Sequence, residues 1–208
     1  MEQDLQASSA LQDVDETELT NEIVTVSRLQ VALRSRARRL QIKFSDIALQ
    51  ANTATPEGLF ELLQETAKTL LENADFWTHV MAGSQTVDSR EEAEALFNQF
   101  SLQERAKFSA ETLTNVNGVV TQQPVAPDHP NEHSAYIVVT LLLGTADDEP
   151  LFNEIYSTSL LRDVLSEITL LRSHFLLAFE LLWTPQDPID SLTDADLAAH
   201  YADLVPIA

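Results

Sequence analysis

The chain has 208 residues, of which 44% are hydrophobic, and this is enough to bury one substantial core. Its formal net charge of −21 and its pI near 4.3 argue against binding to nucleic acid, because phosphate attracts lysine and arginine. The chain has no cysteine, which excludes disulfides, thiolate metal sites and cysteine nucleophiles.

The first twenty residues are polar and acidic, with too few large apolar side chains to pack. We therefore predict a mobile acidic tail over residues 1–20 and a single α+β domain over residues 21–208. The start, Met1 to Asp4, lacks the positive and apolar character of a signal peptide. The longest apolar runs, 136–143 and 175–183, are much shorter than the roughly 20 residues of a membrane helix. These features predict a cytoplasmic protein.

Residues 23–33 are rich in β-branched and apolar residues and predict a strand. The apolar spacing then lengthens to three and four residues, which predicts a helix with one apolar face. The residues on this face are Leu33, Ala37, Leu40, Phe44, Ile47, Ala48 and Ala51.

Half of the twelve basic residues lie between positions 28 and 43, a stretch that contains no acid. In a helix, Arg34 and Arg38 would border one side of the apolar face, and Arg36, Arg39 and Lys43 would border the other. We predict that these five residues bind a partner, preferably an acidic protein surface, and we rank anionic lipid second. The alternative, which the sequence leaves open, is that they pair with the glutamates of the chain itself.

Residues 55–57, Thr-Pro-Glu, predict a helix start, because threonine caps the helix and proline is tolerated at its first position. A strand over 76–87 and a helix over 89–100 follow. Ser101 and Glu104 have the spacing of a capping box, which predicts a second, short helix that ends near Phe108. Residues 112–120 are ambiguous between strand and helix.

The second part of the chain starts after a loop at 121–133, which has prolines at every third position. The sequence of this part predicts a strand at 136–143, a helix at 159–170, a strand at 174–183 and a helix at 193–201. The fold class is therefore α+β, with a mixed sheet and helices packed on it. The order of elements also allows two similar β-α-β-α halves, 22–120 and 134–205, or ordinary alternation within one domain.

The sequence predicts no catalytic, cofactor-binding or metal-binding residue. His129 and His133 match the H-x-x-E-H pattern of one zinc peptidase class, but they lie in the proline-rich loop rather than on a helix. Asp187, Asp190, Asp194 and Asp196 fit helix capping, since they lack the glycine and the closing glutamate of a calcium loop. The four glycines are too scattered for a phosphate-binding loop.

Several blocks of the sequence resemble a known family when they are taken together. They are LQVAL at 29–33, TPEGL at 55–59, FNQFSLQERAKFSAETL at 97–113, YIVVT at 136–140 and LWTPQ at 182–186. Over residues 24–205 the chain resembles a domain-of-unknown-function family, number fifteen-seventeen, of cyanobacteria and chloroplasts. The resemblance implies an oxygenic phototroph and carries over no activity, cofactor or catalytic residue. Members of the family typically carry a hydrophobic region ahead of this domain, and this chain has none, so the resemblance implies a soluble cytoplasmic version.

From these features we expect a non-enzymatic protein-interaction module that serves assembly or regulation of the photosynthetic apparatus. The alternative is a small-molecule-binding or hydrolytic domain with a cleft between its two halves. A deep polar pocket with convergent histidine and carboxylate groups would favour that alternative.

Overall fold

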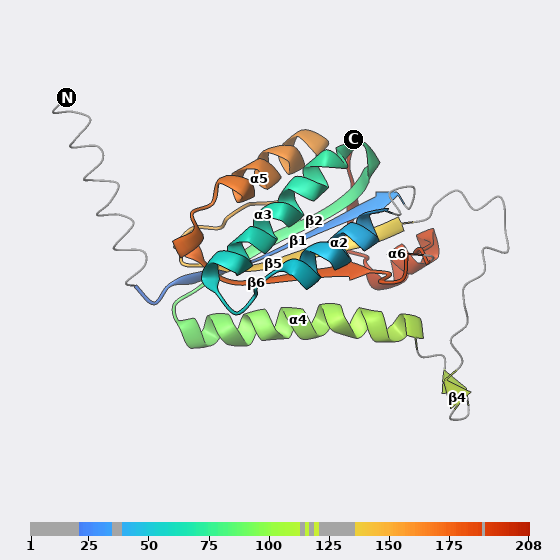
Figure 1. The fold of residues 1–208 in the computed structure, drawn as a ribbon, viewed down its shortest axis with the longest axis horizontal. Coiled ribbons are helices and arrows are strands. Elements are labelled where there is room, and N and C mark those ends of the chain that lie inside the picture. The colour runs from blue at the N-terminus through green and yellow to red at the C-terminus, as the bar shows by residue number, and fades with distance from the viewer. Residues whose placement is uncertain (1–20, 35–38, 113–114, 117–118, 121–135, 189) are drawn as a thin grey trace.

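The computed structural model describes residues 21–34, 39–112, 115–116, 119–120, 136–188 and 190–208. Its centre is a five-stranded sheet in the order β6-β5-β1-β2-β7 (Figure 1). The strands are β1 (Val24–Arg34), β2 (Trp77–Val87), β5 (Tyr136–Thr145), β6 (Leu176–Thr184) and β7 (Val205–Pro206). The predicted α+β class is confirmed, but every strand pair in this sheet is antiparallel, so the sheet is not mixed.

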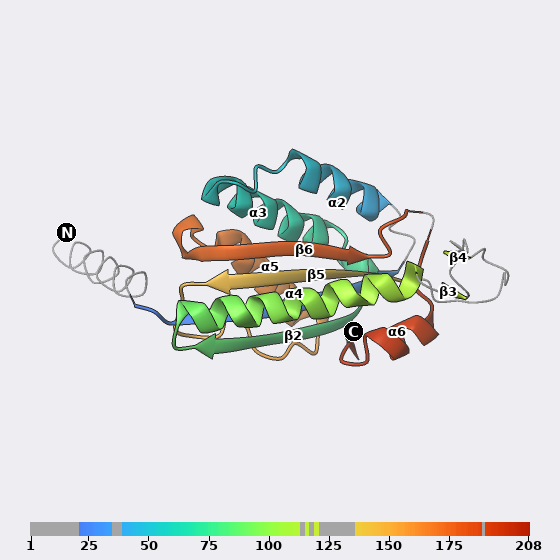
Figure 2. The same ribbon diagram turned by 90° about the horizontal axis from the view of Figure 1, so that it is seen from below.

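Helices lie on both faces of the sheet (Figures 1 and 2). One face is covered by α3 and α5, with α2 beside α3, and α4 crosses the opposite face. The helices are α2 (Arg39–Gln50), α3 (Pro56–Glu72), α4 (Arg90–Thr112), α5 (Thr158–Leu170) and α6 (Asp194–His200). Short 3-10 turns, η2 (Ala74–Phe76) and η3 (Ser173–Phe175), precede β2 and β6, and β3 (Asn115–Val116) pairs with β4 (Val119–Val120) in a separate small hairpin.

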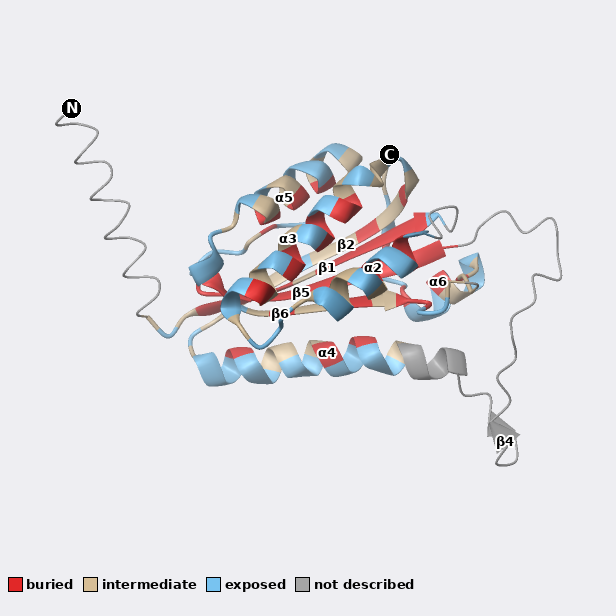
Figure 3. Cartoon of the chain, viewed as in Figure 1, coloured by how far each residue is buried: buried red, intermediate tan, exposed pale blue. Residues whose placement is uncertain are grey.

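The main core lies between the sheet and the layer of α3 and α5, as Figure 3 shows by burial. All ten residues of β5 are buried, because this strand has a neighbour on both edges and helices on both faces. The face under α4 has two smaller apolar clusters. Val26 and Ala93 belong to the cluster near the start of α4, and Ala32 and Tyr201 to the cluster near α6.

The predicted helix starts are confirmed by their capping contacts. The Thr55 hydroxyl accepts a hydrogen bond from the backbone N–H of Gly58 at 3.2 Å, and Pro56 is the first residue of α3. Ser157 caps α5 in the same way. Thr193 and Asp196 form a capping box at the start of α6, which is the capping role predicted for the acids of that segment.

The prediction of a second helix that starts at Ser101 is wrong. The helix is continuous from Arg90 to Thr112, and Ser101 is buried in its middle. The carboxylate of Glu104 does not cap the backbone, because it points to the sheet and accepts hydrogen bonds from Arg28 and Gln30. Glu104 therefore makes tertiary contacts with β1 instead of the capping box with Ser101 that the sequence spacing predicted.

The prediction that Leu33 and Arg34 belong to a helix is also wrong. Both residues are in β1, where Leu33 pairs with Ile137 of β5 and Arg34 pairs with Tyr136. Strand pairing, on both edges of β1 at Leu33 and with β5 at Arg34, overrides the helical spacing at these two positions. The five basic residues therefore do not line a single helix.

The two halves suggested by the sequence meet at the centre of the sheet. β1 and β5 are antiparallel neighbours, and each is flanked by the next long strand along the chain, β2 or β6. This is an arrangement that a duplication would produce. The halves differ in their helices, since no described helix between β5 and β6 corresponds to α2.

Candidate functional site

The predicted partner-binding residues lie at the end of β1 and the start of α2. Arg34 is the exposed last residue of β1, and Arg39 and Lys43 are exposed on α2. Arg36 and Arg38 lie outside the described residues. The structure thus exposes three of the five basic side chains, with Arg39 and Lys43 together on α2 and Arg34 at the end of the middle strand, where it pairs with Tyr136.

The inner face of α2 fixes this helix beside the end of β6. The side-chain amide of Gln41 donates hydrogen bonds to the carbonyl oxygens of Pro185 at 2.7 Å and Asp187 at 2.9 Å. The ring of Phe44, one turn later, lies 6.0 Å from the ring of Trp183 in β6. These contacts orient α2 so that its opposite face is turned to the solvent.

The outer face of α2 combines basic and apolar side chains. Arg39 and Lys43 lie on this face with Ile42, which is 52% exposed, and Leu49, which is 85% exposed. Asp46 is also exposed there. Apolar contact area beside charges of mainly one sign is suited to the docking of a protein of opposite charge. We call the surface made by Arg39, Ile42, Lys43 and Leu49 the α2 surface.

The basic residues of the α2 surface have no acidic partner among the described residues. No ion pair in the described part of the chain joins Arg39, Lys43 or Arg34 to an aspartate or glutamate. Arg28, at the start of the basic stretch, behaves differently, because its guanidinium lies 3.0 Å from the carboxylate of Glu104. The stretch is therefore divided between an intramolecular cation and a group of surface cations.

The junction of α2 and β6 also contains buried polar atoms that lack a hydrogen-bond partner among the described residues. They are Gln41 Oε1, Trp183 Nε1 and Thr184 Oγ1. Native structures contain few such atoms, because buried polar groups are usually paired with protein or with ordered water. This corner of the sheet is thus unusual both in its surface charge and in its buried polar groups.

Under α4, a buried carboxylate is surrounded by donors. The side chain of Glu104 is 1% exposed, and it lies 3.0 Å from Arg28 and 2.8 Å from Lys107. Gln30 Nε2 donates to Glu104 at 2.7 Å and to the hydroxyl of Thr140 at 2.9 Å. These polar contacts fasten α4 to β1 and β5. No local pattern in the sequence indicates this cluster, because the partners of Glu104 in β1 are more than seventy residues away.

A hollow of about 280 Å³ between β2, α6 and β7 brings a histidine and a carboxylate together. Burial lowers the pKa of His79, and the nearby Asp194 carboxylate opposes this shift. The hydroxyl of Tyr136 donates to Asp194 at 2.8 Å. The lining also includes Tyr201, so a histidine and a carboxylate, the groups that commonly act in general acid–base chemistry, converge in this hollow.

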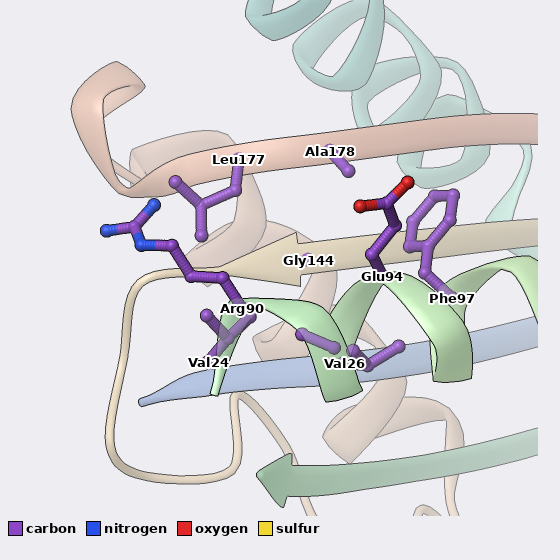
Figure 4. Close-up of a pocket in the computed structure, with 9 residues that line it drawn as sticks. Val24, Val26, Arg90, Glu94, Phe97, Gly144, Leu177 and Ala178 are labelled. Atoms are coloured by element: carbon purple, nitrogen blue, oxygen red, sulfur yellow. The ribbon is translucent and has the colours of Figure 1, made fainter. Parts of the chain in front are cut away.

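A second hollow, of about 240 Å³, lies between the start of α4 and the start of β6 (Figure 4). Gly144 and Ala178 are paired on neighbouring strands and leave room because they are small. Phe97 of α4 lies over this space, and Leu177 stands at its edge. The lining is almost entirely apolar, with Arg90 and Glu94 supplying the charged groups.

The remaining sequence candidates are the aspartates of residues 187–196, of which Asp194 lines the first hollow, and two histidines. His129 and His133 lie outside the described residues. Within the described part of the chain, no three histidine, aspartate or glutamate side chains gather in a way that could hold a metal ion.

Comparison with known proteins agrees with the resemblance found in the sequence. Residues 23–207 match the family model described as "Protein of unknown function (DUF1517)". The chain is 34% identical over 183 residues to FLUCTUATING-LIGHT-ACCLIMATION protein 1, chloroplastic, of Arabidopsis thaliana, in an alignment that covers 88% of this chain and 46% of that protein. It is 34% identical over 189 residues to Protein FLAP1 homolog A of Synechocystis, which covers 87% of this chain and 56% of the relative.

The chain spans about half the length of these curated relatives. No solved structure matches it. None of the helices in the described residues combines the length and the apolar character needed to cross a membrane. Since the family model covers nearly the whole chain beyond its first 22 residues, the protein belongs to the family of unknown function DUF1517.

Proposed function

We propose that this protein is a non-enzymatic protein-interaction module that helps the photosynthetic apparatus adjust to changing light. In this proposal its α2 surface docks on an acidic protein surface in the cytoplasm of an oxygenic phototroph. The name of the Arabidopsis relative, which refers to acclimation to fluctuating light, supports the physiological part. It does not specify a partner or a reaction.

The observation that carries the docking role is the α2 surface itself. The rest of the molecule is strongly acidic, yet Arg39 and Lys43 are exposed together on α2 without an acidic partner among the described residues. Uncompensated cations on an acidic protein attract an acidic partner from a distance and set its orientation. Ile42 and Leu49 add apolar area, which the charged residues alone would not provide.

The proposal is tested by charge reversal on α2. The double variant Arg39→Glu/Lys43→Glu is compared with the wild type in affinity capture from phototroph lysate, followed by identification of the retained proteins. We expect the double variant to retain about one tenth or less of the amount of partner that the wild type captures. We also expect the wild type to capture less partner as the salt concentration is raised.

The matched control is Lys68→Glu/Arg172→Glu, which changes the net charge equally at two exposed positions away from α2. It should capture the partner as the wild type does. Unchanged capture by the Arg39/Lys43 variant would overturn the proposal. A clear fall in its melting temperature would instead support pairing of these cations with the protein's own acids.

A further inference from the structure

The two edges of the central sheet differ in whether a further strand covers them. The edge at β2 is covered in part by β7, whose residues Val205 and Pro206 pair with Val80 and His79. At the other edge is β6, and no described strand pairs with its outer side. The backbone N–H and C=O groups of β6 that point away from β5, on alternate residues of this nine-residue strand, therefore have no strand partner among the described residues.

β6 carries one of the devices that usually protect an open strand, a register shift that leaves Leu177 without a partner in β5, and it lacks others. It contains no proline or lysine, and its charged residue, Glu180, forms an ion pair with Arg105 of α4. Its exposure fits an open edge, because only part of β6 is buried whereas its neighbour β5 is buried throughout. Such an edge is a template for the addition of another strand.

The hollow of Figure 4 adjoins this edge. Leu177 and Ala178 of β6 line it, with Phe97 of α4 on the other side. A strand added beside β6 would lie about 4.8 Å away, and its side chains on the α4 side would reach this apolar space. The open backbone would provide affinity, and the hollow would select an apolar side chain.

The two ends of the β6 edge differ in charge. Glu94 of α4 lines the hollow near the start of β6. The start of α2 lies at the other end, because Gln41 is hydrogen-bonded to Pro185, directly after β6. Arg39 and Lys43 lie two residues before and after Gln41, so they place positive charge near that end, on the side of α2 that faces the solvent.

We propose that an extended segment of the acidic partner adds to β6 as a further antiparallel strand. Its apolar side chain enters the hollow beside Ala178, and its carboxylates meet Arg39 and Lys43. If the added segment runs antiparallel to β6, its acidic residues come before its apolar residues in the sequence. The two groups are then about 30 Å apart, which is the length of the nine residues of β6. This inference deepens the proposed function, since it assumes the same acidic partner and the same α2 surface.

A synthetic peptide provides the test. In this probe two glutamates precede an alternating run of threonine and valine long enough to follow β6, and the control probe has the glutamates at the opposite end. Binding is measured by titration, and hydrogen exchange of the β6 amides is followed by NMR. We expect the first probe to bind more tightly and to protect alternate amides of β6, since only those facing outward gain a partner.

Two single variants examine the edge and the hollow. Leu177→Lys adds a charge at the edge and Ala178→Leu fills the hollow, and each should weaken binding of the first probe by about tenfold or more. Leu102→Lys is the matched control, because Leu102 is an apolar residue of α4 that is 69% exposed and lies outside the hollow. Its affinity for the probe should equal that of the wild type.

Other outcomes would overturn the strand addition. If the probe fails to bind, or binds with new protection on α2 alone, then β6 is not the docking edge. The second of these results would leave docking on the α2 surface intact, so the two proposals fail separately. If alternate β6 amides become protected without any probe as protein concentration rises, the occupant is a second copy of the chain rather than an acidic partner.

Discussion

Glu104 shows how a single residue determines the position of a whole helix. Its buried carboxylate forms ion pairs with Arg28 of β1 and with Lys107 of its own helix. These two cations also lie over aromatic rings, Arg28 at 4.8 Å from the centre of Phe100 and Lys107 at 4.4 Å from that of Tyr201. Each cation thus has both a carboxylate and a ring, which offsets the cost of removing Glu104 from water.

The substitution Glu104→Gln should destabilise the protein by about 3 kcal/mol. It removes a buried charge that two cations face, and it turns an amide donor toward at least one of them. The measurement is the free energy of unfolding from urea denaturation. Glu92→Gln, at an exposed position of the same helix, should change this free energy by less than about 0.5 kcal/mol. A loss at Glu104 of less than about 1 kcal/mol would mean that the network does not hold α4.

At the scale of elements, local patterns predicted most of the structure. The β-branched run at residues 23–33 was sufficient to predict β1, and Thr55-Pro56 was sufficient to predict the start of α3. Strand composition and helix capping are local properties of the sequence. The two errors occurred where distant residues decide. Ser101 is in mid-helix because Glu104 pairs with residues more than seventy positions away, and Leu33 is extended because it pairs with Trp77 and Ile137.

The continuity of α4 can be tested with the substitution Leu102→Pro. If Ser101 capped a new helix, Leu102 would be its first residue, where proline is tolerated. In the continuous helix, proline removes a hydrogen bond and clashes with the preceding turn, so we expect a loss of about 3 kcal/mol or more in the free energy of unfolding. Since Leu102 is largely exposed, Leu102→Ala serves as the control and should be nearly neutral.

At the scale of the molecule, the candidate site was predictable only in part. The basic composition of residues 28–43 indicated Arg34, Arg39 and Lys43, but not that Arg28 is committed to Glu104. The corner where α2 meets β6 is formed by Gln41 and Pro185, which are 144 residues apart, and no local pattern reports such a contact. The open edge of β6 likewise depends on the strand order, which the sequence alone left undetermined.

The strand order has a further consequence for the two predicted halves. β1 and β5, one from each half, are the central pair of the sheet, and Leu29 and Leu141 are paired and fully buried there. A fragment of residues 22–120 would therefore expose one edge of β1 along its whole length and would lose the part of the core contributed by β5 and α5. We expect this fragment to be unfolded, because it cannot bury enough apolar surface to offset the entropy of ordering its chain.

The measurement is far-UV circular dichroism and amide NMR dispersion of the fragment, compared with the full chain and with an equimolar mixture of fragments 22–120 and 134–205. Recovery of dispersed signals only in the mixture would show that the halves fold together, as expected for one domain joined through β1 and β5. A cooperative unfolding transition of residues 22–120 alone would contradict the prediction. That result would mean that each half is an autonomous unit, and that the central pair of strands is an interface between two domains rather than the middle of one core.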